Sequence, residues 1–485
     1  MILLLTILLP LVGGFALHLI RPSSQKVRLW YVEGVVLCTS MLCLYCLLNP
    51  STEPLVLYSI MDHLPIALRV DGCGSVFAGL VAILWPLATF YGMEYMMHEE
   101  RPNTFFVFYT MTYGVTMGIC FSANLFTLYM FYECLTMITL PLVAHKRDPE
   151  SQLAARNYVI FSVTGAAMAF VGMIFMVHYG LSVDFVLGGN LDPTKIAGRE
   201  DALRWIFLLS LVGFGTKAAI FPMHAWLPMV SVAPTPVTAL LHAVAVVNAG
   251  AFAVIRLIYY SFGPDLLYGS FAQTIALCLT SFTIVYSSVM AVKEQHLKRR
   301  LAYSTSANLA YMLMGACLCT PAGLVGSLMH MVCHGFMKIT LFWCVGAVMI
   351  YTGKTRVQEV RGLNRIMPKT CLCYTVAAIA LTGTPPLCGF VSKWQLLTAA
   401  NAISGWGGIV ATVALIVSAV LSAVYALSIS FEMYFRPLPE GSGTASRDPG
   451  LLILLPLLFC LVVIVLLGVY SSPLLHFLQG IAGVI

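Results

Sequence analysis

Three titratable side chains are evenly spaced along one apolar stretch of the chain. His330, His334 and Lys338 follow one another at intervals of four residues. Because a helix turns once every 3.6 residues, they form one stripe about 12 Å long. Imidazole changes charge near neutral pH, so such a stripe could pass protons through water molecules. Two alternatives stay open: an inert packed stripe, and a metal site, although no acidic residue or third ligand accompanies the two histidines.

A single lysine lies deep in another apolar stretch. Lys217 follows twelve residues that begin at Trp205, and Pro222 comes five residues after it. An ammonium in hydrocarbon costs about 2.5–3.5 kcal/mol on insertion scales. Proline breaks or kinks a helix, and the freed carbonyls then need protein or water. We therefore expect an ion or proton site lined by a discontinuous helix, with a lysine that extends to the interface as the alternative.

Other charged side chains also interrupt apolar stretches. The lone carboxylate of Glu133 needs a cation or a proton; the lysine of the broken helix is the obvious partner, and a protonated acid bonded to a neighbouring helix is the alternative. His242 fits either a satisfied core histidine or a relay. Lys298, taken alone, is typical of a positive-inside anchor. Glu432 fits a proton exit or an interfacial acid, and Glu33 is equally ambiguous.

Composition identifies a polytopic membrane protein. Of the 485 residues, 60% are hydrophobic and 9% are charged, whereas soluble domains carry about 25% charged residues. The net charge of +6 indicates topology and not nucleic-acid binding. The apolar start to Ile20 is expected to stay as a span and not to be cleaved. Most of the 15 cysteines lie in apolar stretches and are interpreted as small apolar residues, so we expect no metal and no cofactor in this chain.

About fourteen spans have the roughly twenty-residue length that a bilayer requires. They are expected at 2–20, 28–48, 72–97, 104–121, 124–145, 154–182, 202–225, 233–260, 268–293, 299–319, 322–352, 369–400, 407–435 and 450–475. Between the second and third spans, the segments 55–60 and 66–70 flank a turn at Asp62 and His63. They predict a short β-hairpin outside the bilayer.

The distribution of lysine and arginine predicts the orientation. With the N-terminus outside, 18 of the 26 lie at inner loops and flanks, and three lie inside spans. The five at outer positions are Arg69, Lys195, Arg199, Arg204 and Arg256. The positive-inside rule then places both termini outside, which agrees with an even number of spans.

The second half of the chain echoes the first. The span at 369–400 combines Pro385 and Pro386 with Lys393 in apolar surroundings. Five spans separate it from the broken helix of Lys217, so a five-helix repeat would lie upside down relative to its partner, as in inverted-repeat transporters. The predicted units are 1–103, with three helices and the hairpin; 104–260, the first repeat; 261–435, the second, inverted repeat; and 436–485, the last helix.

Four segments together resemble a known family. They are residues 217–237, with Pro222-Met223-His224-Ala225-Trp226-Leu227-Pro228; residues 297–305; residues 330–338; and residues 389–393. In this order they resemble the antiporter-like membrane subunits of respiratory complex I, of Mrp-type Na+/H+ antiporters and of membrane-bound hydrogenases. The resemblance covers about residues 70–435.

The resemblance implies a fold and a set of site residues. It implies an all-α protein of fourteen transmembrane helices, with two inverted five-helix repeats and breaks in helices 7 and 12. It implies a pair in helices 5 and 7, matched by Glu133 and Lys217, a central lysine matched by Lys338, and a terminal one matched by Lys393. It also makes Lys298 and His242 relay candidates, beside His330 and His334.

Two departures from the family pattern are expected to matter. Several relatives carry a lysine in the eighth span where this chain has Asn248, which cannot carry a proton charge. Either His242 serves there, or that half of the relay is connected differently. The longest relatives also continue into a lateral amphipathic helix, which this chain is expected to lack.

The resemblance favours a proton-translocating subunit of a multisubunit membrane complex, with coupling to Na+ left open. Its partners would be other membrane subunits, including paralogous antiporter-like ones, in the inner membrane of a prokaryote. Flavin and iron–sulfur clusters would belong to partner subunits of a quinone reductase or hydrogenase. The alternatives are an Mrp-type Na+/H+ antiporter without redox chemistry and a structural scaffold.

Overall fold

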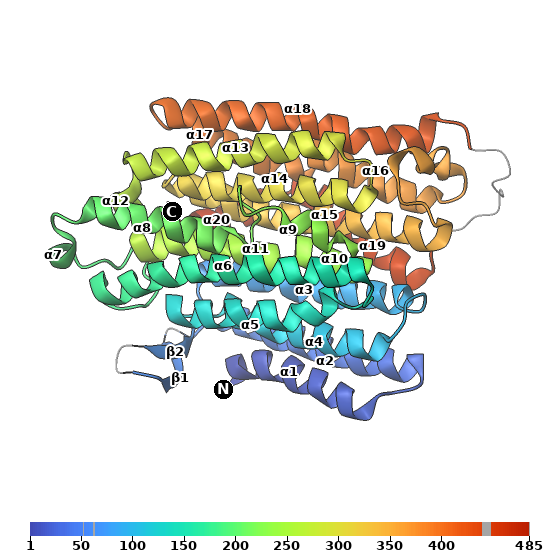
Figure 1. The fold of residues 1–485 in the computed structure, drawn as a ribbon, viewed down its shortest axis with the longest axis horizontal. Coiled ribbons are helices and arrows are strands. Elements are labelled where there is room, and N and C mark those ends of the chain that lie inside the picture. Colours follow the sequence, from blue (N-terminus) through green and yellow to red (C-terminus); the bar gives the residue numbers. More distant parts are fainter. Residues whose placement is uncertain (52, 62–63, 439–447, 485) are drawn as a thin grey trace.

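The chain forms a bundle of long helices that run alongside one another (Figure 1). The computed structural model describes residues 1–51, 53–61, 64–438 and 448–484. The first helix starts toward the same end of the bundle at which the last helix, the hairpin and α7 lie. We call this end the N-terminal face, and the other end the opposite face.

The N-terminal part consists of three long helices and a hairpin. Its elements are α1 (Ile2–Ile20), α2 (Gln25–Leu48), β1 (Leu55–Ser59), β2 (Pro65–Leu68) and α3 (Gly72–Tyr95). The strands pair antiparallel, with Leu55 opposite Leu68, so the predicted hairpin is confirmed. Its turn residues, Asp62 and His63, lie outside the described part of the chain. Asp71 caps α3, because its side chain accepts a hydrogen bond from the Gly74 nitrogen.

The middle of the chain holds the first interrupted helix. Its elements are α4 (Pro102–Cys120), α5 (Leu125–Val143), α6 (Pro149–Tyr179), α7 (Pro193–Ile196), α8 (Glu200–Gly215), α9 (Trp226–Met229), the 3-10 helix η1 (Val230–Val232), α10 (Thr235–Ala243), α11 (Val246–Arg256) and the π-helix η2 (Leu257–Phe262). The sequence predicts that the helix breaks at Pro222. In the structure it ends earlier, at Gly215, because a turn with Ala219 at φ +54° already occupies residues 216–219.

The last part contains the second interrupted helix. Its elements are α12 (Pro264–Leu267), α13 (Phe271–Lys293), α14 (Leu297–Cys317), α15 (Pro321–Thr352), the 3-10 helices η3 (Val357–Val360) and η4 (Leu363–Arg365), α16 (Pro368–Thr382), α17 (Cys388–Asn401), α18 (Trp406–Phe435), α19 (Leu451–Val469) and α20 (Ser472–Ile481). The predicted break at Pro385 and Pro386 separates α16 from α17.

Hydropathy and burial distinguish central from peripheral helices. Within the described residues, ten helices or helical runs are long and apolar enough to cross a membrane. The most apolar window of α10 to η2 is fully buried and that of α15 is 89% buried, while those of α1 and α19 are only 33% buried. The protein is therefore an integral membrane protein, with α10, α11 and α15 at its centre.

Candidate functional site

Lys217 lies in the turn that interrupts the first broken helix. It follows α8 by two residues, and regular helix resumes only at Trp226. Its side chain is 1% exposed, so protein encloses the ammonium. The predicted discontinuous helix with a buried lysine is therefore present.

Other side chains satisfy the backbone groups that this interruption frees. The indole of Trp226 donates to the Thr216 carbonyl at 2.9 Å. The hydroxyl of Ser306, on α14, donates to the Ala219 carbonyl at 2.9 Å. Gly250 of α11 packs so closely that an added Cβ would lie 2.5 Å from a backbone nitrogen of the turn. Helix breaks persist inside membranes where protein supplies such partners, so tertiary packing holds this one.

The Lys217 ammonium faces α5. Its Nζ lies 4.0 Å from Oε1 of Glu133, donates a hydrogen bond to the Tyr132 carbonyl, and sits 3.4 Å from the centre of the Tyr132 ring. Among the described residues, Glu133 Oε1 has no hydrogen-bond partner. The lysine therefore has two sets of partners side by side, and a small movement would close or open the ion pair.

His242 lies just before an interruption that the sequence did not predict. The expected span 233–260 stops being helical at Ala243 and resumes at Val246. Asn248 donates from Nδ2 to the Ala243 carbonyl at 2.9 Å, so its amide bridges the gap. The His242 ring packs on Phe342, 4.9 Å away, and neither ring nitrogen has a hydrogen-bond partner in the described chain. Both nitrogens are thus available to a proton or water.

Lys298 connects the interior with a polar cavity. It is buried, and its Nζ donates to the Ala233 carbonyl at 2.7 Å. The cavity holds about 740 Å³ at the opposite face. Its polar lining includes Lys146, Asp148, Glu150, Asn157, His224, Tyr286, Glu294, His296, Lys298, Arg299 and Tyr303. Burial, followed by the charges of Lys298 and Arg299, lowers the pKa of the loop residue His296 to about 4. That imidazole is therefore neutral at pH 7.

The predicted stripe on α15 is buried at the centre of the bundle. His330, His334 and Lys338 are each 0% exposed. The two imidazole rings lie 6.3 Å apart, and His330 Nδ1 is 3.0 Å from the Ser392 hydroxyl of α17. Lys338 donates to the Ser304 hydroxyl at 2.5 Å. The stripe thus contacts α14 at one end and α17 at the other.

Lys393 caps the end of a half-helix. Its Nζ donates to the carbonyls of Leu381 and Thr382, at 2.7 Å and 3.3 Å, where α16 ends. Unsatisfied carbonyls at a helix C-terminus carry partial negative charge, which favours an ammonium. The same Nζ lies 5.4 Å from the centre of the Tyr311 ring. Both predicted break lysines therefore sit at a helix interruption, although their partners differ.

The eight predicted site residues fall into two groups. Glu133 and Lys217 act on each other electrostatically. The second group runs across the bundle, because each member interacts with the next through its charge. In order, its members are Lys298, His242, Lys338 with His334, His330 and Lys393. The two groups meet at α11, which packs Gly250 on the Lys217 turn and carries Asn248 beside the end of α10.

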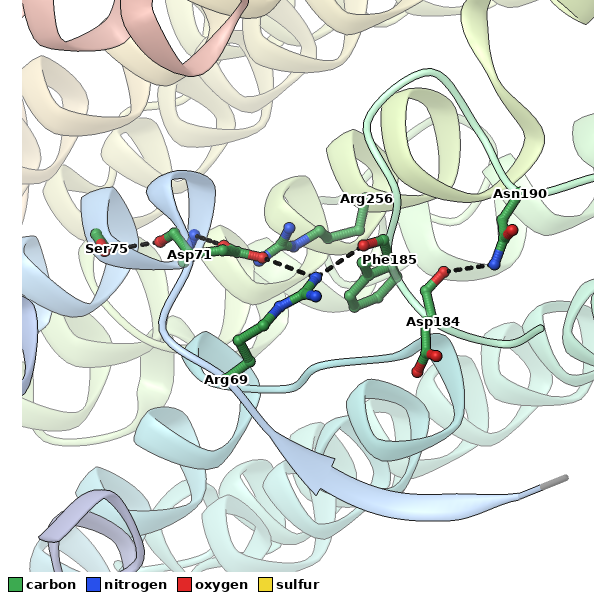
Figure 2. A network of polar contacts seen from close by, with 8 residues as sticks. Arg69, Asp71, Ser75, Asp184, Phe185, Asn190 and Arg256 are labelled. Carbon is green, nitrogen blue, oxygen red and sulfur yellow. Dashed lines mark hydrogen bonds and ion pairs between the residues drawn. The ribbon is translucent and has the colours of Figure 1, made fainter. Parts of the chain in front are cut away.

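The sequence missed a buried ion pair at the far end of α11 (Figure 2). The side chain of Arg256, a residue predicted at an outer position, is 0% exposed, and its NH2 lies 2.5 Å from Asp71 Oδ1. Rings of Phe185, Phe252 and Tyr260 surround the guanidinium within 5 Å. A guanidinium with a carboxylate partner and aromatic faces is stable inside protein. No spacing rule relates residues 71 and 256, so the pair was not predictable.

Arg69 completes this network. Its NH2 lies 3.9 Å from Asp71 Oδ2 and donates to the Phe185 carbonyl at 2.7 Å. The network therefore ties the hairpin and α3 to the loop before α7 and to the end of α11.

The two ambiguous acids differ in their surroundings. Glu432 pairs with Arg361 at 3.1 Å and Arg436 at 3.7 Å, as an interfacial acid would. Glu33 is 3% exposed, and neither carboxylate oxygen has a hydrogen-bond partner among the described residues.

The sequence of the chain matches one known protein family. The family described as "NADH:quinone oxidoreductase/Mrp antiporter, TM" matches residues 122–422, more than half of the chain. The chain belongs to this family. The matched region contains all eight predicted site residues, and the resemblance drawn from the motifs is confirmed.

Relatives within the family come from different complexes. The chain is 28% identical over 426 residues to NADH-quinone oxidoreductase subunit N of Desulforudis audaxviator (strain MP104C), which covers 84% of this chain and 83% of that relative. It is 26% identical over 502 residues to Na(+)/H(+) antiporter subunit A1 of Staphylococcus haemolyticus (strain JCSC1435), which covers 96% of this chain and 61% of that relative. The chain spans about half the length of several other curated relatives that it matches.

A solved structure shows the same fold. One chain of the membrane-bound sulfane sulfur reductase, an archaeal respiratory membrane complex, superposes with a TM-score of 0.84 at 21% identity. The match covers 99% of this chain and 96% of that one. The protein is thus an antiporter-like membrane subunit of the kind found in complex I, Mrp and related complexes.

Proposed function

We propose that this chain translocates protons across an energy-transducing membrane as one subunit of a larger complex. The observation that carries the proposal is the row of buried titratable groups from Lys298 to Lys393, with the Glu133–Lys217 pair beside it. Ionisable side chains inside a membrane are costly and mark proton or ion pathways. A scaffold without transport would have no use for this row.

The polar cavity at the opposite face supplies protons to Lys298. From there a proton passes to His242, whose two ring nitrogens face no competing described partner. It then reaches Lys338 and, past the stripe of His334 and His330, the Lys393 amine. Asn248 takes no part in this transfer, because an amide does not titrate and its nitrogen donates to the Ala243 carbonyl.

Lys217 controls this transfer through its choice of partner. When it closes on Glu133, the pair is neutral as a whole, and when it turns to the Tyr132 carbonyl and ring, its positive charge is left unbalanced. An unbalanced charge in a low-dielectric interior repels a proton on the neighbouring relay. Opening and closing of the ion pair therefore drives protons away from Lys298 toward Lys393.

The topology we propose has fourteen crossings and both termini outside. Helices α4 and α14 have 19 and 21 residues, about the length that a bilayer needs. Together with the two interrupted helices, α8 with α9 and α16 with α17, they raise the count from ten to fourteen. Residues 104–260 and 261–435 then form the two inverted five-helix repeats. Each holds one of the predicted breaks, and the first also holds the gap between α10 and α11.

The relatives suggest two classes of host complex. In the first, this subunit is the pumping part of a quinone reductase or hydrogenase in a prokaryotic inner membrane, and flavin and iron–sulfur clusters reside in partner subunits. In the second, it is part of an Mrp-type antiporter that exchanges Na+ for H+. Paralogous antiporter-like subunits are partners in both. We favour the first because the redox-linked relative is matched over most of its length, 83%, whereas the antiporter relative is matched over 61%.

Transport by the native complex in liposomes tests the proposal. The Lys338→Ala variant should assemble normally and lose proton transport at least about tenfold, since proton relays contribute factors of 10² or more. The exposed Lys26→Ala variant is the matched control. Wild-type transport by Lys338→Ala would refute the relay. Stoichiometric iron and flavin in the purified complex would identify the redox-driven class, and their absence the antiporter class.

A further inference from the structure

Two polar stripes with the same spacing face each other between α14 and α18. One consists of Ser304, Asn308 and Tyr311, and the other of Ser418, Ser422 and Tyr425, each at positions i, i+4 and i+7. This spacing places three side chains on one face of a helix. We call the two stripes together the polar seam. All six residues are 1% exposed or less.

The polar seam is hydrogen-bonded across the two helices. At one end, Ser304 donates to the Tyr425 hydroxyl at 2.7 Å. At the other end, Tyr311 donates to the Ser418 hydroxyl at 2.7 Å. In the middle, the Ser422 hydroxyl lies 3.1 Å from that of Tyr425 and donates to the Ser418 carbonyl at 2.7 Å. Ser418 therefore joins the two hydrogen-bonded halves of the seam, because its carbonyl accepts from Ser422 and its hydroxyl from Tyr311.

The two ends of the seam lie beside two relay lysines. Lys338 donates to Ser304 at 2.5 Å. Lys393 lies over the face of the Tyr311 ring, and the same ring packs on that of His330 at 71°, with the ring centres 5.3 Å apart. From Ser304 to Tyr311, α14 rises about 10 Å. The seam therefore covers the interval between Lys338 and Lys393, beside the histidine stripe.

The histidine stripe lacks this continuity. Within the described residues, neither nitrogen of His334 has a hydrogen-bond partner, and His330 bonds only through Nδ1. Proton transfer requires donor and acceptor within hydrogen-bonding distance, directly or through one water. The hydroxyls of the seam meet that condition directly from Lys338 as far as Ser422, and one water would carry the chain on to Tyr311.

We propose that the polar seam carries protons between Lys338 and Lys393. The inference rests on the proposed function, and it assigns transport to Ser304, Tyr425, Ser422 and Tyr311, in that order. The bond directions agree with it as far as Ser422: Lys338 donates to Ser304, and Ser304 donates to Tyr425. Ser422 directs its own proton to the Ser418 carbonyl, which leaves its oxygen to accept from Tyr425.

The protons balance along this path. The Lys338 ammonium gives one proton to Ser304, and each hydroxyl passes its own proton on as it accepts another. Ser422 and Tyr311 donate to Ser418 at rest, so both hydroxyls turn for their steps, and the proton of Ser422 reaches Tyr311 through one water. Tyr311 passes the last proton to the neutral Lys393 amine, whose stem turns away from the carbonyls at the end of α16 for this step. Lys338 ends as a neutral amine, Lys393 as an ammonium, and no serine or tyrosine remains charged.

Tyrosine-to-phenylalanine variants of the native complex test the seam. Tyr425→Phe and Tyr311→Phe remove one hydroxyl each and keep the ring, so the contacts of Tyr311 with Lys393 and His330 survive. Tyr374→Phe is the matched control, because that buried hydroxyl has no hydrogen-bond partner in the described chain. The readout is the initial rate of proton transport in liposomes, per assembled complex, driven by the complex's own substrate or by an imposed Na+ gradient.

Each seam variant should transport at least tenfold more slowly, with Tyr374→Phe within twofold of wild type. Ser422→Ala should be slow and Ser422→Thr should restore the rate, which a purely structural role would not produce once rates are normalised to assembly. A rate within twofold of wild type in either Tyr425→Phe or Tyr311→Phe would overturn the inference. Lys338→Ala in the same vesicles distinguishes a failure of the seam from a failure of the proposed function. If Lys338→Ala is inactive while both tyrosine variants are active, only the seam is wrong. If Lys338→Ala is active, the proposed function fails.

Discussion

Removing Asp71 should destabilise the protein more than removing its partner Arg256. The Asp71→Asn variant leaves a guanidinium that is 0% exposed and whose Nε and NH1 already have no hydrogen-bond partner among the described residues. Loss of one partner of a buried ion pair costs about 3–5 kcal/mol, because the other charge stays buried and unpaired.

In the Arg256→Met variant, Asp71 keeps two other interaction partners. Asp71 is 19% exposed, keeps the Gly74 nitrogen at 2.8 Å, and keeps Arg69 at 3.9 Å. We expect a loss of about 1.5–3 kcal/mol, the range for a hydrogen bond to a charged group.

Thermal unfolding of the purified complex, followed by intrinsic fluorescence, measures this asymmetry. The Asp71→Asn/Arg256→Met double variant should be more stable than Asp71→Asn alone, since it no longer buries an unpaired charge. Asp201→Asn, which breaks a surface pair with Arg204, is the control and should lose less than about 1 kcal/mol. Equal losses in the two single variants, or additive losses in the double variant, would refute the electrostatic explanation.

Two further predictions concern the surroundings of the relay. Gly250→Ala places a Cβ 2.5 Å from the Ala218 nitrogen, so it should lower the free energy of unfolding by about 1–3 kcal/mol and slow proton transport by displacing the Lys217 turn. Gly34→Ala is the control, because a Cβ there meets nothing within 4 Å. It should change neither the melting temperature nor the transport rate. His296 has a folded pKa of about 4 against an ordinary 6.5, so the folded state binds fewer protons between these values and the free energy of unfolding should fall as pH drops from 6.5 toward 4. His296→Asn should flatten that fall in melting curves recorded across this range, and an unchanged slope would contradict the assignment.

The sequence predicted what depends on composition and short-range spacing. Span lengths follow from hydropathy, and α1 has the predicted bounds of 2–20. The stripe on α15 follows from helical periodicity, and the second break from its prolines. The polar seam was equally accessible, because both of its stripes have the same i, i+4, i+7 spacing, but single serines and tyrosines in an apolar helix gave no reason to pair them.

Features that depend on distant contacts were beyond the sequence. The first break begins at Thr216 and not at Pro222, because partners from Trp226 and Ser306 stabilise the open backbone there. The gap after Ala243 depends on the Asn248 amide. In the sequence this position stood out only because several relatives carry a lysine there. The buried position of Arg256 required its carboxylate partner, which lies 185 residues away.

In the proposed function, the Lys217–Glu133 pair drives proton movement through the membrane. Proton transport by the assembled native complex carrying Lys217→Ala tests it most directly, with Lys195→Ala, a 49% exposed lysine, as the control. We expect Lys217→Ala to lose proton transport by at least about tenfold with assembly intact, and Lys195→Ala to transport protons as the wild type does. Wild-type transport by an assembled Lys217→Ala complex would contradict it.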